Sequence, residues 1–129
     1  MRIDHVGYAV RNIEKSKSDF EDLGFTFEEI VTDTDRNIYI CFGENDGYRI
    51  ELIQPMGIGE TPVDLVLENN GPTPYHICYI TDNIDVEIDR LAKRHYVLSS
   101  PPAEAVAFNK HKVAFLYKAK VGLIELVEQ

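Results

Sequence analysis

The chain repeats itself, and this repeat limits the possible folds more than any other feature of the sequence. The segment IDHVGYAVRNIEKSKSDFEDLGF (3–25) aligns without a gap with PYHICYITDNIDVEIDRLAKRHY (74–96). A repeat of about half the chain indicates two copies of one supersecondary unit. The identical pairs include His5 with His76, Tyr8 with Tyr79, Asn12 with Asn83 and Ile13 with Ile84.

A second match closes each half of the chain. The segment YRIELIQP (48–55) aligns with GLIELVEQ (122–129), so that Glu51 falls on Glu125. Either match alone can be a coincidence between short apolar strands, but both in the same order make chance a poor explanation. Each half therefore begins with a strand that carries a histidine and ends with a strand that carries a glutamate.

The local patterns predict a strand, a helix and then further strands in each half. In the first half, a strand at 3–10 precedes a helix that Asn12 caps and Gly24 ends. Turn residues between alternating segments indicate the strands that follow. The predicted strands are 26–31, 37–43 and 48–54 in the first half and 112–117 and 122–127 in the second; the predicted helices are 84–94, capped by Asp82 or Asn83, and 63–69, with Thr61 as cap and Pro62 at its first position.

These elements predict one α+β domain over residues 1–129, with module one at about 1–55, a connector at about 56–73 and module two at about 74–129.

The composition is globular, and no apolar run is long enough to cross a bilayer, so we expect a cytoplasmic protein. The net charge of −9 argues against nucleic acid and anionic membranes as partners. Cys41 and Cys78 lie alone in apolar strands and are expected to be buried free thiols.

Strand parity gives the histidines and glutamates a possible function. Side chains alternate between the faces of a strand, so bulky residues such as Tyr8 pack on the helix and His5 lies on the opposite face. The same parity predicts that four polar side chains converge on one cleft, and buried carboxylates require a counter-ion. Two imidazoles and two carboxylates could together bind one divalent ion. This mixture of nitrogen and oxygen ligands suits Zn, Ni, Co, Fe or Mn better than magnesium or calcium. The predicted ligands are His5, Glu51, His76 and Glu125.

Four ordered segments resemble the vicinal oxygen chelate superfamily, which includes glyoxalase I, methylmalonyl-CoA epimerase, extradiol dioxygenases and the fosfomycin- and bleomycin-resistance proteins. These segments are IDHVGYAVRNIEKS, RIELIQP, PYHICYITDNID and KVAFLYKAKVGLIELVE. The resemblance covers nearly the whole chain. It implies two tandem βαβββ modules that form a curved open sheet around a metal cleft, with the same four residues as metal ligands.

The resemblance also implies a reaction class. Isomerases and epimerases of this superfamily abstract a proton next to a carbonyl group and use the metal to stabilise the enolate. Glu125 or Glu51 is then the catalytic base. The expected activity is similar to methylmalonyl-CoA epimerase or to lactoylglutathione lyase, with an acyl thioester or a glutathione adduct as substrate, in a homodimer. Epimerases of this family can have a glutamate that acts as a base on the strand before the strand equivalent to that of Glu51. The corresponding segment here, NIYICF, contains no glutamate.

Two other hypotheses remain open, namely a metal-free protein that binds small molecules on the same scaffold and a structural domain in which the four polar residues coincide by chance. Three further residues are weaker candidates for contacts with a substrate. Cys78 lies two residues after His76 on the proposed cleft face, although a packed thiol is the ordinary role there. Asn109 and Lys112 belong to the segment FNKHKV, which also fits a solvated turn.

Overall fold

The computed structural model describes all 129 residues, which form nine β-strands, three α-helices and one short 3-10 helix. Two compact units can be distinguished. The first unit is His5–Tyr75, and the second unit combines Met1–Asp4 with His76–Gln129. Each unit is built from one strand, one helix and a further antiparallel group of strands, so the predicted α+β class with two βαβββ modules is confirmed.

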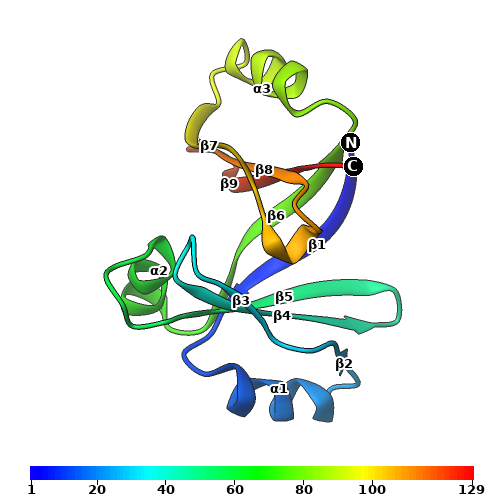
Figure 1. Ribbon diagram of the computed structural model, residues 1–129, viewed down its shortest axis with the longest axis vertical. Coiled ribbons are helices and arrows are strands. Elements are labelled where there is room, and N and C mark those ends of the chain that lie inside the picture. Colours follow the sequence, from blue (N-terminus) through cyan, green and yellow to red (C-terminus); the bar gives the residue numbers. More distant parts are fainter. The chain divides into compact units, whose positions relative to one another are not determined.

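The first unit places its histidine strand beside its glutamate strand. Strand β1 (Arg2–Ala9), which belongs to this unit from His5 onward, runs parallel to β5 (Tyr48–Pro55). Strand β4 (Ile38–Asn45) pairs antiparallel with β5, and β2 (Thr26–Phe27) and β3 (Val31–Asp33) both pair antiparallel with β4. Helix α1 (Ile13–Asp22) covers one face of this sheet, as Figure 1 shows, and α2 (Pro62–Asn70) follows β5.

The second unit repeats this order of strands. Strand β6 (Thr73–Thr81) runs parallel to β9 (Gly122–Glu128), which pairs antiparallel with β8 (Lys112–Lys118). Helix α3 (Ile84–Ala92) covers one face of this sheet (Figure 1). Strand β7 (Val97–Glu104) pairs with β8 at the edge and was not predicted from the sequence. The 3-10 helix η1 (Val106–Phe108) connects β7 to β8.

Helices α1 and α3 begin in the same way. An extended asparagine caps each helix, which confirms Asn12 and selects Asn83 over Asp82 as the cap of α3. The first helical N–H group then donates a hydrogen bond to a side chain at the end of the glutamate strand. These bonds run from the Ile13 nitrogen to Gln54 Oε1 and from the Ile84 nitrogen to Glu128 Oε2, both at 2.9 Å.

The two helices also end at equivalent positions, but with different residues. Gly24 follows α1 with φ of 103°, and His95 follows α3 with φ of 70°. Both values lie in the left-handed region, which glycine adopts without a steric penalty and which costs other residues about 1–2 kcal/mol. His95, three residues beyond the end of α3, therefore has a backbone conformation that suits glycine better.

The hydrophobic cores confirm the predicted strand parity. Tyr8 of β1 and Val10, which follows this strand, pack toward α1, whereas Tyr79 of β6 packs toward α3. The first core is rich in aromatic rings and the second in aliphatic side chains. The first comprises Val10, Ile13, Cys41 and Leu52 with Tyr8, Phe20, Phe27, Tyr39 and Ile50, and the second comprises Ile84, Leu91, Ala114, Leu116, Ile124 and Leu126 with Tyr79, Ile88 and Tyr96.

Both cysteines are free and buried, as predicted. The Cys41 thiol packs in the first core and donates a hydrogen bond to the main-chain oxygen of Glu28 at 3.2 Å. Burial raises the pKa of this thiol above its ordinary value. Cys41 is therefore a packing residue, because a reactive thiol requires a lowered pKa.

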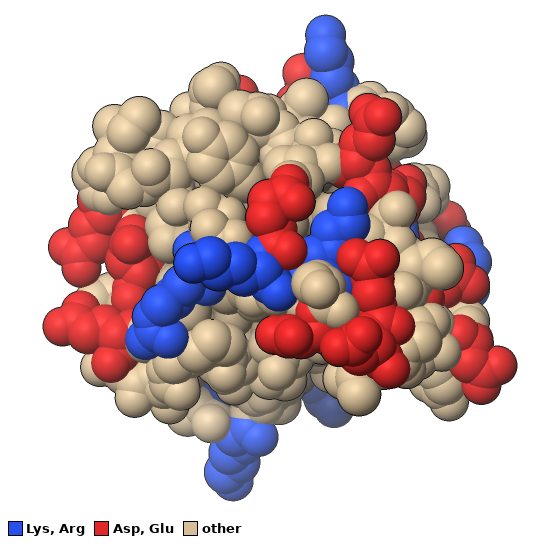
Figure 2. Space-filling model, turned by 90° about the horizontal axis from the view of Figure 1, so that it is seen from below, with Lys and Arg blue, Asp and Glu red and all other residues tan.

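No helix of the protein has the length and apolar character that a bilayer crossing requires. On the face seen from below in Figure 2, Asp and Glu side chains are interspersed with Lys and Arg side chains.

Candidate functional site: a histidine–glutamate pair in each unit

The first unit brings His5 and Glu51 together in its interior. The parallel register of β1 and β5 sets Gly7 opposite Glu51, which places His5 one pleat away on the same face. His5 Nε2 lies 3.6 Å from Glu51 Oε1. The two residues are 1% and 3% exposed, so this contact is shielded from water.

The second unit contains the equivalent pair. The register of β6 and β9 sets Cys78 opposite Glu125, and His76 lies one pleat away on the same face. His76 Nε2 lies 3.2 Å from Glu125 Oε2. Both residues are 3% exposed. The histidine strand and the glutamate strand of each half are therefore neighbours in both units, and each unit contains one buried histidine–glutamate pair.

An aromatic ring supports each histidine in the same manner. Phe42 lies opposite Glu51 in the antiparallel register, and its ring meets the His5 ring edge to face at a centroid distance of 5.4 Å. Phe115 lies opposite Glu125, and its ring meets the His76 ring at 5.4 Å. A buried ring on one side restricts the rotation of the imidazole, so each histidine is held in position toward its glutamate.

Cys78 distinguishes the second pair from the first. Its thiol donates a hydrogen bond of 3.5 Å to Glu125 Oε1, whereas the 3.2 Å contact of His76 is with Oε2. The equivalent residue in the first unit is Gly7, which has no side chain to offer. Cys78 thus lies on the histidine face and contacts Glu125, while its contact with a substrate stays a prediction.

The other two weak candidates lie at the surface. Asn109 follows η1 with a left-handed φ of 52°, and Lys112 begins β8; both residues are exposed. Sequence analysis missed Arg49, which shares the face of Glu51 on β5. The Arg49 guanidinium lies 4.0 Å above the centroid of the Phe42 ring and 3.7 Å from the Glu28 carboxylate. The spacing of two residues between Arg49 and Glu51 was the available signal.

The burial of these groups has an electrostatic consequence. Each unit buries one carboxylate beside one imidazole, and an isolated buried carboxylate is strongly unfavourable. An imidazole nitrogen and a carboxylate oxygen at this spacing are also the ligand types that bind divalent transition metals. His5, Glu51, His76 and Glu125 thus make up a set of residues that could hold a metal ion.

The fold and this set of residues define the class of protein. A family model for the glyoxalase/bleomycin resistance protein/dioxygenase superfamily matches residues 4–115, and the chain belongs to this superfamily. The resemblance noted in the sequence is therefore confirmed.

Individual proteins of known sequence are also similar to this chain. The chain is 29% identical over 130 residues to the uncharacterized protein YqjC of Bacillus subtilis, covering 98% of this chain and 91% of that protein. It is 29% identical over 128 residues to mouse mitochondrial methylmalonyl-CoA epimerase, covering 97% of this chain and 71% of the relative.

Solved structures share the fold. Methylmalonyl-CoA epimerase from Mycobacterium tuberculosis matches with a TM-score of 0.83 at 23% identity, covering 98% of this chain and 87% of that chain. The Streptomyces coelicolor methylmalonyl-CoA epimerase in complex with 2-nitronate-propionyl-CoA matches with a TM-score of 0.85 at 19% identity, covering 100% and 97%.

Proposed function

We propose that this protein is a metal-dependent epimerase of acyl-CoA thioesters and acts by proton abstraction next to the thioester carbonyl. The observation that carries the proposal is the pair of equivalent buried contacts, His5 with Glu51 and His76 with Glu125. The similarity to methylmalonyl-CoA epimerases over nearly the full chain supports the choice of substrate class.

In this proposal, the two pairs together hold one divalent ion. Two neutral imidazoles and two carboxylates balance the charge of such an ion, which accounts for carboxylates that are only 3% exposed. Phe42 and Phe115 keep the imidazoles oriented, as the supporting residues of a metal site do. Zn, Ni, Co, Fe and Mn all accept this mixture of nitrogen and oxygen ligands.

The chemistry needs a base and a means to stabilise negative charge. A divalent ion bound by these ligands would supply positive charge where the carbonyl oxygen of the thioester becomes negative. Glu125 or Glu51 takes the proton from the adjacent carbon, and the electrons of the broken C–H bond move toward the carbonyl oxygen. Return of a proton to the opposite face of that carbon inverts its configuration.

Two measurements test the proposal separately. The first is the metal content of purified protein after stripping and reloading, for which we expect about one divalent ion per chain. The His5→Ala, His76→Ala double variant should lose this ion. His95→Asn is the matched control, because it removes an exposed imidazole at the end of α3 and leaves both pairs intact.

The second measurement is the incorporation of deuterium from heavy water at the carbon next to the carbonyl. The panel comprises 2-methyl acyl-CoA thioesters and glutathione hemithioacetals. Exchange with the acyl-CoA compounds supports the epimerase, whereas exchange with the hemithioacetals alone would redirect the proposal to a glyoxalase-type lyase. Metal retention without exchange on either class would favour a binding protein.

A further inference from the structure

A pocket lies within the second unit, between α3 and the sheet. Its volume is about 410 Å³, which falls in the range of small-molecule sites. Tyr79 and Ile124 line the pocket and alternate along their strands with Cys78 and Glu125. The pocket therefore opens on the face of this sheet opposite to the face that carries His76 and Glu125. Its lining comprises Met1, Tyr79, Arg90, Leu91, Arg94, Tyr96, Lys118, Val121 and Ile124.

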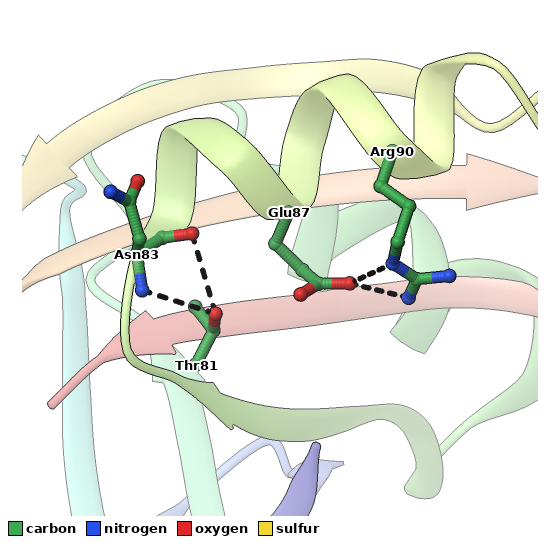
Figure 3. Close-up of polar contacts among 4 residues, drawn as sticks. All are labelled: Thr81, Asn83, Glu87 and Arg90. Carbon is green, nitrogen blue, oxygen red and sulfur yellow. Dashed lines mark hydrogen bonds and ion pairs between the residues drawn. The ribbon is translucent and has the colours of Figure 1, made fainter.

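Three cations line this pocket in a protein whose net charge is −9. Glu87 pairs with Arg90 on α3, as Figure 3 shows, and offsets one of the positive charges. Lys118 Nζ donates a hydrogen bond of 2.7 Å to the main-chain oxygen of Arg94 and lies 5.1 Å from the centroid of the Tyr96 ring. The ammonium group is thus held over an aromatic ring at the wall of the pocket.

The first unit provides an internal reference for these cations. The repeat aligns Arg90 with Asp19 and Arg94 with Leu23. Asn45 is the counterpart of Lys118, because Asn45 Nδ2 donates the equivalent hydrogen bond to the main-chain oxygen of Leu23 at 3.1 Å. None of these three counterparts is a cation, so the positive charge is a property of the second unit and not of the framework.

The space itself also arises from a difference between the units. In the first unit, the Phe20 ring contacts the rings of Tyr8, Phe25 and Phe27 at centroid distances of 5.1, 5.6 and 6.3 Å. The residue aligned with Phe20 in the second unit is Leu91, which is smaller and lines the pocket. The second unit therefore has room where the first unit has a cluster of rings in edge-to-face contact.

We propose that this pocket binds a phosphorylated ligand with a flat aromatic part, of the nucleotide class. After Glu87 is taken into account, Arg90, Arg94 and Lys118 leave a surplus of about two positive charges, which matches the charge of about −1.5 to −2 on a phosphate monoester near neutral pH. Guanidinium groups bind phosphate oxygens in a bidentate manner. Tyr79 and Tyr96 offer ring surfaces for the aromatic part.

The test is a calorimetric titration of the full chain with adenosine monophosphate in metal-free buffer of low ionic strength. We expect binding, and we expect adenosine to bind at least about tenfold more weakly because it lacks the charge-assisted hydrogen bonds. The Arg94→Gln, Lys118→Gln double variant should weaken the binding of adenosine monophosphate by at least about tenfold. Lys93→Gln is the matched control, because Lys93 is an exposed cation of the same helix end that does not line the pocket.

A second variant fills the pocket without changing its charge. Leu91→Phe restores the ring that the first unit carries at this position and should abolish binding, with folding checked by thermal melting. No binding of adenosine monophosphate, or equal binding by the double glutamine variant, would overturn the proposal. Loss of binding in Lys93→Gln as well would also overturn it, since the effect would then reflect general charge.

Coenzyme A carries a phosphorylated adenosine, so a competition experiment distinguishes two sources of the ligand. If adenosine monophosphate displaces coenzyme A, the pocket holds the nucleotide end of that molecule. If both bind together, the pocket serves a separate nucleotide. Either result requires the same dependence on Arg94 and Lys118, and neither depends on metal or on catalysis, so the test remains valid if the proposed epimerase activity is absent.

Discussion

The two units of the protein are alike on one face of their sheets and different on the other. On the histidine face, both units place an imidazole beside a glutamate and an aromatic ring against the imidazole, with equal ring distances of 5.4 Å. On the helix face, one unit packs phenylalanine rings and the other has an aliphatic core beside a cationic pocket. The repeated framework thus holds its polar pairs in one geometry, while the packing on the helix face of the sheet differs between the units.

The histidine face is not fully symmetric, and this asymmetry concerns the glutamates. Glu125 accepts a hydrogen bond from Cys78, whereas Gly7 occupies the equivalent position near Glu51. The two glutamates therefore differ in this contact, and variants of each glutamate test whether they also differ in function.

The largest expected effect concerns the two glutamates. Glu51→Gln and Glu125→Gln should each lower the rate constant for deuterium exchange, and the variant that removes the base should lose about 10²–10⁴-fold while it keeps its metal. The variant that removes only a ligand should mainly weaken metal binding.

Metal content and exchange rates of both variants, measured side by side, give the assignment. Glu68→Gln is the control, since Glu68 is exposed on α2 and carries the same charge. Exchange that falls less than about tenfold in both variants would contradict a role for either carboxylate as the base.

In the first unit, Gly43 of β4 packs closely against the ring of Phe27 on β2. A Cβ atom added to Gly43 would lie 2.4 Å from the Phe27 ring, which is too close for any real contact. Gly43→Ala should therefore lower the free energy of unfolding by about 1–3 kcal/mol. Urea denaturation monitored by circular dichroism measures this change.

The second unit suggests the compensating change. Its residues equivalent to Gly43 and Phe27 are Leu116 and Leu98, a larger residue facing a smaller one. Phe27→Leu should therefore restore part of the stability that Gly43→Ala removes. If the two substitutions simply add, the contact between Gly43 and Phe27 does not limit the packing of this core.

The sequence predicted the histidine face well because its signals are local and repeated. Side chains alternate along a strand, so parity was enough to predict that His5, Glu51, His76 and Glu125 lie opposite the face that packs on the helices. The strand pairings that set each histidine beside its glutamate come from the structure. The caps Asn12 and Thr61 were also predicted, since capping depends on residues within one turn of the helix.

The features that the sequence did not predict depend on distant residues or irregular strands. Strand β7 contains Pro101 and Pro102 and shifts register twice against β8, so its side chains do not alternate. Proline is tolerated there because the strand lies at an edge of the sheet. The cationic pocket combines Arg90, Arg94 and Lys118 from separate elements, and only the folded unit brings them to one wall.

The smallest expected effect concerns the ends of α1 and α3. Gly24→Ala should lower the free energy of unfolding by about 1 kcal/mol, because φ of 103° is unfavourable for any residue with a Cβ atom. His95→Gly should raise it by a similar amount of about 1 kcal/mol, since His95 has the equivalent left-handed conformation with φ of 70°. His95→Asn should fall between the wild type and the glycine variant, because asparagine tolerates this region better than most residues. Thermal and urea denaturation of the three variants measure these changes. A His95→Gly variant that is less stable than the wild type would contradict the prediction. It would show that a contact of the His95 side chain stabilises the fold by more free energy than the left-handed backbone costs.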